Sequence, residues 1–254
     1  MPEASLALNR MVWDAVGPST TATALPHWGP LATPEGELKL LGDIREQRVL
    51  ELGCGGGHSL LWLAAAGAAE LWGLDISRNQ LIAARQELDA RQVPARLIHS
   101  SFEDAAGLPA AHFDLAVSVF ALGWAMRLDI ALARIAGCLR PGGRLVFSWE
   151  HPFFSVLAER NGEVIVAERY RSDGRPRRRA FHGAEVALIP RSLGDWIAAV
   201  TAAGLILEGL VEPGLDERQL ADHHHAPGYA YSLAKAARVP TTFILAARKP
   251  GSPA

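Results

Sequence analysis

Four glycines stand close together at Gly53 and at Gly55 to Gly57, after the apolar segment RVLEL (48–52). A strand that turns sharply into a helix leaves backbone N–H groups free at the helix start. Glycines at such a turn permit positive φ angles and let a ligand approach the backbone closely. Glu51 precedes the glycines, and Asp75 follows Gly53 by 22 residues. We expect a ligand-binding loop here, the simpler alternative being a tight turn.

The two carboxylates indicate which ligand such a loop would bind. A carboxylate at the place of Asp75 can accept both hydroxyls of an adenosine ribose. The dinucleotide pattern GxGxxG read from Gly53 would need glycine where this chain has His58, and the GK[ST] ending of a phosphate loop is absent. Glu51 is a poor neighbour for a pyrophosphate but suits a positively charged ligand. The pattern favours a ligand with a ribose, a cationic end and no phosphate.

A framework of alternating strands and helices must position these residues. From about residue 47, short apolar runs alternate with helical patterns, which predicts a parallel sheet covered on both faces. Ser77 is expected to cap one helix, and Ser192 with Asp195 to form the capping box of another. The predicted strands are 48–52, 70–75, 95–100, 113–120, 144–150, 205–212 and 241–249.

Composition limits the classes of protein to consider. The chain has 254 residues, of which 49% are hydrophobic, enough for one large α/β domain or two small ones. A net charge of −2 argues against a general binder of nucleic acid or membrane surfaces. Cys54 and Cys138 lack CxxC spacing, so neither a disulfide framework nor a zinc site is expected. With no signal peptide and no apolar stretch of roughly 20 residues, we expect a soluble cytoplasmic protein.

Five segments of the chain resemble the motifs of class I S-adenosylmethionine (SAM)-dependent methyltransferases of the small-molecule type. VLELGCGGG is similar to the first motif and GLDIS to the second, while SFED…LP, FDLAVS and LRPGGRLVFS look like the third to fifth. They cover roughly residues 36–150 in the family's order. The resemblance implies an α/β, Rossmann-like fold with a seven-stranded, mostly parallel sheet, an antiparallel last strand, and a lid insertion after the fifth strand. It also implies SAM as cofactor and S-adenosylhomocysteine (SAH) as product.

The resemblance carries the family's cofactor contacts onto matching positions of this chain. Gly53 and Gly55 would pass the methionine part of the cofactor by backbone contact, and Glu51 would bind its amino group. Asp75 would hold the ribose hydroxyls, and Ile76 would pack on the adenine. The other implied positions are Cys54, Gly56, Gln80 at the adenine edge, Ser101 and Phe102 at the adenine amino group, Glu103 or Asp104 as substitutes for the family's Asp, and Val119 and Phe120 at the methionine end.

The family places substrate recognition on the N-terminal arm and on the insertion after the fifth strand. Trp13 and Trp28 in the arm would contact substrate or pack in the core. Glu150 and His151 end the fifth strand, where α/β sheets open to ligands. His151 is the candidate general base because imidazole titrates near neutral pH, and the alternative is a structural histidine. Weaker substrate candidates are Tyr170 and His182. Where many relatives have a histidine before Trp124 this chain has Gly123, to which we assign no chemistry.

The insertion itself is expected to form a hairpin or lid. Two β-like pieces, 163–170 and 184–189, flank an Arg-rich turn. The segment RYRSDGRPRRRAFH (169–182) holds six arginines, which could bind phosphate, carboxylate or RNA. In a chain of near-zero net charge a solvated hairpin tip is favoured. DHHHAP (222–227) could suggest a metal, but adjacent histidines point apart, so a polar loop is favoured and no metal site is expected.

We therefore expect a single methyltransferase domain over 1–254. Its predicted parts are an N-terminal arm (1–35), a SAM-binding core (36–150), the inserted lid (151–190) and the C-terminal part of the core (191–254). The expected reaction moves a methyl group to an O, N, C or S atom of a small organic acceptor, such as a secondary metabolite. No nucleic-acid or membrane partner is expected, and the protein would be a monomer or homodimer. The alternatives are an RNA or protein methyltransferase, or a SAM-binding cyclase or partner subunit.

Overall fold

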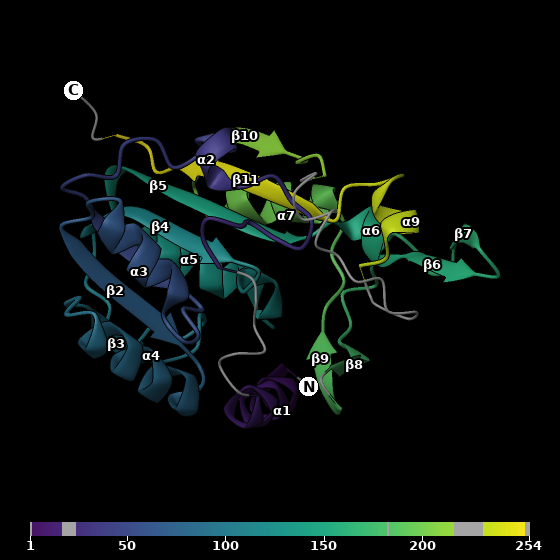
Figure 1. Cartoon of the computed structure of the whole chain (residues 1–254), viewed down its shortest axis with the longest axis horizontal. Coiled ribbons are helices and arrows are strands. Elements are labelled where there is room, and N and C mark those ends of the chain that lie inside the picture. The colour runs from purple at the N-terminus through teal and green to yellow at the C-terminus, as the bar shows by residue number, and fades with distance from the viewer. Residues whose placement is uncertain (1, 17–23, 182, 216–230, 252–254) are drawn as a thin grey trace.

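One seven-stranded sheet with helices on both faces forms the core of the molecule (Figure 1). The structure, a computed structural model, describes residues 2–16, 24–181, 183–215 and 231–251. The strand order is β10-β11-β5-β4-β1-β2-β3. The strands of this sheet are β1 (Arg48–Leu52), β2 (Glu70–Asp75), β3 (Arg96–His99), β4 (Phe113–Val119), β5 (Leu139–Glu150), β10 (Ile206–Val211) and β11 (Thr242–Arg248).

The direction of the strands agrees with the predicted fold. From β5 to β3 all neighbouring strands are parallel, whereas β11 is antiparallel to both β5 and β10. The predicted mostly parallel sheet with an antiparallel last strand is therefore confirmed. Because β1 pairs with β2 on one side and β4 on the other, the strand order reverses at β1. Such a reversal opens a crevice beyond the carboxyl ends of the strands, so the loops after β1 and β4 meet there.

Each face of the sheet has its own hydrophobic layer. In β1, Val49 belongs to one layer and its neighbour Leu50 to the other, as expected for side chains that alternate along a strand. Ser77 and the Ser192–Asp195 capping box begin their helices as predicted. The covering helices are α3 (His58–Ala65) and α4 (Arg78–Ala90) on the Val49 side, and α5 (Leu128–Cys138) and α7 (Leu193–Ala202) on the Leu50 side.

Two hairpins, not one, make up the insertion after β5. Strand β6 (Leu157–Arg160) pairs with β7 (Glu163–Val166), and β8 (Arg177–Phe181) pairs with β9 (Ala184–Leu188). The predicted hairpin of 163–170 with 184–189 is therefore wrong, and residues 177–181 of the Arg-rich segment form strand β8. The reason is local. Asn161 and Gly162 both have positive φ (53° and 80°), the signature of a tight two-residue turn that joins β6 to β7.

Residues before β1 form helix α1 (Pro2–Ala15) and helix α2 (Glu35–Leu38). Figure 1 shows α1 between α4 and the β8–β9 hairpin. Trp28 is 0% exposed, and its Nε1 donates a hydrogen bond to Glu35 Oε2 at 2.9 Å. Trp28 thus packs in the core with a satisfied indole N–H, which is the alternative to substrate contact that the sequence left open. The remaining short helices are η2 (Leu122–Trp124), α6 (Pro152–Ser155) and α9 (Leu233–Ala236).

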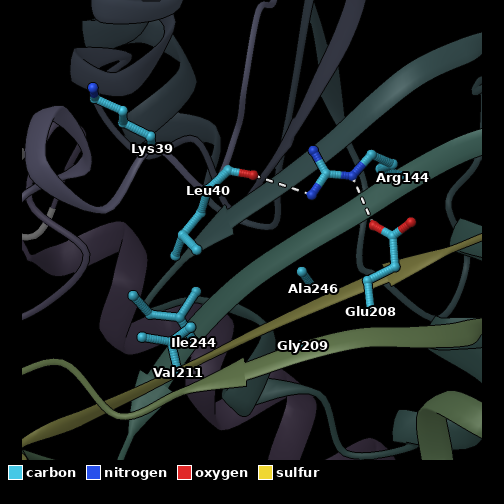
Figure 2. A pocket seen from close by; sticks show the side chains of 8 residues that line it. All are labelled: Lys39, Leu40, Arg144, Glu208, Gly209, Val211, Ile244 and Ala246. Carbon is cyan, nitrogen blue, oxygen red and sulfur yellow. Dashed lines mark hydrogen bonds and ion pairs between the residues drawn. The ribbon is translucent and has the colours of Figure 1, made fainter.

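A cavity of about 260 Å³ opens beside β10 and β11 (Figure 2). Arg144 crosses it, donating from Nη2 to Leu40 O at 3.1 Å and from Nε to Glu208 Oε2 at 2.9 Å. Because Arg144 lies early in β5, this cavity is at the opposite end of the strands from the glycine loop. Its role here is structural, since the arginine ties the segment after α2 to the sheet.

Gly123 in η2 leaves room for an aromatic ring. A Cβ placed on Gly123 would lie 1.9 Å from the Trp149 ring. Trp149 packs edge-on against Trp124, with ring centroids 5.4 Å apart, and is tilted against Phe120 at 5.6 Å. The glycine is therefore required by packing at this position.

We expect Gly123→Ala to destabilise the protein by about 1–3 kcal/mol, since the added methyl group would displace Trp149 from a packed site. Gly137→Ala is the matched control, because Gly137 lies in α5 with open space around its Cβ position, and this change should stabilise by about 0.5–1 kcal/mol. Urea unfolding of both variants measures the difference. Equal stability of Gly123→Ala and the wild type would contradict the packing argument.

Candidate functional site

The turn from β1 into α3 has the backbone that its glycines predict. Gly53, Gly55 and Gly57 have φ of 74°, 48° and 84°. A Cβ on Gly53 would lie 2.2 Å from the Cβ of Ala121, which follows β4, so this position also excludes any side chain. The loops after β1 and β4 are thus in contact at the strand-order reversal.

Three N–H groups of this loop are already bonded within the protein, so they are not available to an anion. Gly53 and Cys54 both donate to Leu74 O, at 2.7 and 3.1 Å, and Gly55 donates to Asp75 Oδ2 at 2.9 Å. A phosphate-binding loop needs such donors to point at the ligand. The arrangement therefore fits a ligand without phosphate.

Asp75 ends β2 and is buried beside the loop. Its Oδ2 accepts the Gly55 N–H, and its Oδ1 accepts the Ser77 N–H at 2.8 Å. Each carboxylate oxygen has a second lone pair, so two hydroxyl donors can still be accepted. Burial raises the pKa of Asp75 above its usual value, although the backbone donors of Ser77 and Gly55 oppose this. The structure brings Asp75 and the glycines together, as predicted.

Glu51 is the most unusual group of the site. Its side chain is 2% exposed, and Oε2 is buried without a hydrogen-bond partner among the described residues. Burial raises the pKa of Glu51 to about 8, and the nearby charge of Asp75 adds to this while a hydrogen bond from Ser59 opposes it. A buried carboxylate without a counter-charge takes up either a proton or a cation. Glu51 therefore fits the positively charged ligand that the sequence suggests.

Of the residues predicted to contact adenine, some already have partners within the protein. Ile76 follows Asp75, and its carbonyl accepts a hydrogen bond from His99 Nε2 at 2.9 Å. Phe102 extends to within 3.3 Å of the Cβ position of Gly53. Ser101 Oγ donates to Asp104 Oδ2 at 2.9 Å, so these two residues are partnered with each other. Roles for them toward adenine stay predictions.

Two further predicted cofactor residues have other partners. Glu103 Oε1 accepts the N–H groups of Met126 and Arg127, at 2.8 and 3.1 Å, and so fixes the turn between η2 and α5. Gln80 donates from Nε2 to Val16 O at 2.9 Å, and its buried Oε1 has no hydrogen-bond partner among the described residues. The structure links Gln80 to the N-terminal arm, which the sequence did not indicate.

Aromatic rings gather at the position predicted for the methionine part of the cofactor. Val119 ends β4, and Phe120 next to it has φ of 51°. Its ring lies 5.6 Å from Trp149 and 6.4 Å from Tyr231, measured between centroids. Trp149 and Tyr231 were not singled out from sequence. Trp149 looks like any apolar residue of a buried strand, and Tyr231 is distant in sequence from every motif.

His151 is held at both ring nitrogens. Nδ1 accepts the Phe153 N–H at 3.2 Å, which makes His151 the N-cap of α6, and Nε2 lies 2.6 Å from Glu212 Oε1. Nδ1 is thus the acceptor and Nε2–H the donor. Burial lowers the pKa of His151, while Glu212 partly opposes this. The role of His151 as a base stays a prediction, because neither nitrogen is directed at a substrate in this conformation.

The other predicted substrate residues lie in different surroundings. Glu150 is buried and accepts a hydrogen bond from Arg179 Nη1 at 2.8 Å. Tyr170 Oη accepts the Leu193 N–H at 3.2 Å. Trp13 packs against Phe181 and Trp124, with centroids 5.1 and 5.6 Å apart. His182 and the histidines at 223–225 lie outside the described residues.

The helices among the described residues are too short or too polar to span a bilayer. In the same part of the chain, no three or more His, Cys, Asp or Glu side chains are grouped so that they could hold a metal ion.

Comparison with known proteins identifies the central part of the chain. Residues 50–147 match the family model described as a methyltransferase domain. An uncharacterized protein of Haemophilus influenzae is 37% identical over 126 residues, which are 48% of this chain and 49% of that protein. The O-methyltransferase cnsE of Penicillium expansum is 38% identical over 110 residues, 42% of this chain and 40% of that protein. The chain thus aligns with about half the length of these curated relatives or less.

Solved structures extend the likeness to most of the fold. A SAM-dependent methyltransferase from Mesorhizobium loti has a TM-score of 0.66 and 24% identity, covering 84% of this chain and 96% of that chain. A putative SAM-dependent methyltransferase from Listeria monocytogenes has a TM-score of 0.67 and 21% identity, covering 85% of this chain and 95% of that chain. At these identities the likeness shows a shared fold.

The protonation of Glu51 leads to a test of its burial. A carboxyl group whose pKa is raised on folding stabilises the fold fully below its unfolded pKa, and this stability is lost as pH rises toward the folded pKa. Between about pH 5 and 8, the unfolding free energy of the wild type should therefore fall relative to Glu51→Gln by up to ~1.4 kcal/mol per pH unit. Urea unfolding at several pH values measures this difference. A constant difference would show that Glu51 is ionised in the folded protein.

Proposed function

We propose that the chain, which carries a methyltransferase domain with the fold of SAM-dependent methyltransferases, transfers the methyl group of SAM to a small organic acceptor, such as a secondary metabolite. SAM supplies a methyl carbon on a cationic sulfur, which an O, N, C or S nucleophile attacks in line. The observation that carries the proposal is the buried carboxylate of Glu51 beside Asp75 and the glycine loop, whose Oε2 has no hydrogen-bond partner among the described residues.

The residues present fit this cofactor. Glu51 is placed to bind the amino group, which would supply the missing counter-charge for Oε2. Asp75 keeps two lone pairs for the ribose hydroxyls after accepting the backbone donors of Gly55 and Ser77. Gly53 permits close approach, because no side chain stands between it and Ala121. The N–H groups of Gly53, Cys54 and Gly55 are already used within the protein, which favours a phosphate-free, cationic ligand.

The chain's contribution to the reaction is chiefly positioning and exclusion of water. Phe120, Trp149 and Trp124 form an apolar wall next to the methionine end, since each ring contacts the next. A base is needed only for an acceptor that is protonated at working pH. His151 could serve only after its ring leaves Glu212 or Phe153.

A small acceptor is favoured over a polymer by the partners of the Arg-rich strand. Arg177 Nη1 lies 3.1 Å from Glu168, Arg178 Nη1 lies 3.7 Å from Glu185, and Arg179 Nη1 lies 2.8 Å from Glu150. Each of these three arginines is therefore paired with a carboxylate, so β8 does not present a surplus of positive charge for phosphates.

The first test is calorimetric titration of SAM and of SAH into the protein. We expect micromolar binding that Asp75→Ala weakens about 100-fold, because two charge-assisted hydrogen bonds to the ribose are lost. Asp89→Ala is the control, since Asp89 is an exposed carboxylate on α4 paired with Arg85. Failure of the wild type to bind either ligand would contradict the cofactor assignment. Labelled methyl transfer to a panel of acceptors follows if binding is found.

The polymer alternative has a separate test. Replacing Arg177, Arg178 and Arg179 by Ala should leave RNA retention unchanged in a filter-binding assay at low and moderate salt, since the wild type itself should retain little RNA. Strong, salt-dependent RNA binding by the wild type that disappears in the triple variant would instead favour an RNA methyltransferase.

A further inference from the structure

Helix α1 is bound at its C-terminal end to the residues that follow Asp75. Asp14 Oδ1 accepts a hydrogen bond from Ser77 Oγ at 2.8 Å, and Asp14 O accepts one from Asn79 Nδ2 at 2.9 Å. Val16 O, just beyond the helix, accepts the Gln80 Nε2–H at 2.9 Å. The arm is therefore fastened to the start of α4, beside the proposed ribose site.

The same helix is bound to the β8–β9 hairpin. Asn9 donates from Nδ2 to Ala187 O at 2.9 Å and accepts the Ala187 N–H at Oδ1, at 2.8 Å. Asn9 is 2% exposed, so both bonds are buried. Trp13 adds ring contacts to Phe181 of β8 and to Trp124 of η2, at 5.1 and 5.6 Å between centroids. Figure 1 shows α1 lying between α4 and β9, as these contacts require.

These contacts bind α1 and the hairpin to each other. Separating Asn9 from Ala187 would leave a buried backbone donor and acceptor unpaired, which is unfavourable. Separating Trp13 from its two aromatic neighbours would lose two ring contacts as well. Releasing Asp14 from Ser77 at the other end breaks a more accessible bond, because that contact is only partly buried.

Gln80 can accept a hydrogen bond from a ligand. Its Nε2 is committed to Val16, while its Oε1 is buried, has no partner among the described residues, and lies 3.8 Å from the Cβ position of Gly55. A hydroxyl or amino donor of a ligand lying along the glycine loop would satisfy Oε1. That bond would fix the amide in the orientation that binds Val16.

We propose that α1 transmits occupancy of the cofactor site to the β8–β9 hairpin, with Gln80 and Asn9 as the positioning residues at its two ends. The inference rests on the proposed function, because the ligand at Gln80 is the adenosine part of SAM or SAH. Cofactor binding strengthens the attachment of α1 to α4, and α1 holds the hairpin against η2, next to the aromatic wall of the acceptor end. The acceptor end is then held more firmly when the cofactor is bound.

Hydrogen–deuterium exchange of the full chain with and without saturating SAH tests this. In the wild type, SAH should slow exchange in peptides from the glycine loop and from 75–81, and also in peptides of β8 and β9, which the ligand does not touch. Asn9→Leu keeps the size and burial of the side chain but loses both bonds to Ala187. In this variant the loop should remain protected by SAH while protection of the hairpin falls at least about threefold.

Three comparisons keep the result interpretable. Met11→Ala is the matched control, since Met11 is 67% exposed on the same helix, and it should leave hairpin protection unchanged. Asn9→Asp retains an acceptor for the Ala187 N–H and serves if Asn9→Leu does not fold. Gln80→Met should retain SAH binding by calorimetry, although weakened, and lose hairpin protection.

The outcomes separate this inference from the proposed function. SAH binding with protection confined to the glycine loop and 75–81 would overturn the coupling while leaving the cofactor assignment intact. Hairpin protection that persists in Asn9→Leu and Asn9→Asp would overturn it as well. Absence of SAH binding by calorimetry would overturn both.

Discussion

Two carboxyl groups buried at the ends of adjacent parallel strands set the conditions for the rest of the site. Asp75 is stabilised by two backbone donors, whereas Glu51 Oε2 has no donor among the described residues. The low-dielectric surroundings make each ionised carboxylate costly and make their mutual repulsion stronger. The site is therefore most stable when a proton or a cation lies at Glu51. The burial of Glu51 therefore favours a positively charged ligand, whatever the shape of that ligand.

The shape of the site follows from how the two loops at the strand-order reversal pack on each other. Ala121 occupies the space that a side chain at position 53 would need, and the Trp149 ring does the same at position 123. Both positions therefore need glycine. The turn of the first loop also directs the N–H groups of Gly53, Cys54 and Gly55 inward, toward Leu74 and Asp75. Packing thus leaves the backbone at Gly53 without a side chain, and hydrogen bonding uses the N–H groups of Gly53, Cys54 and Gly55 within the protein.

Much of the fold could be predicted because its signals are local. The strands alternate between two layers, and Ser77 and Ser192 carry their capping function in a few neighbouring residues. The insertion was predicted wrongly although Asn161-Gly162, a strong hairpin signal, stands in the sequence. Gln80 and Asn9 were beyond local reasoning, because their partners Val16 and Ala187 are 64 and 178 residues away. Trp28 and His151 show that residue type alone does not distinguish a packed or capping role from a reactive one.

The distance in sequence between Asn9 and Ala187 has a consequence for how the chain is made. Asn9 leaves the ribosome before the strand that receives its amide, which is synthesised 178 residues later. Until then, Val12, Trp13 and Val16 have no hairpin to pack against, and they remain an exposed apolar surface on a nascent chain. Contacts of such long range also slow folding, because the loop between them must close first. The apolar face of α1 is therefore covered by the hairpin only after strands β1 to β5 have been synthesised.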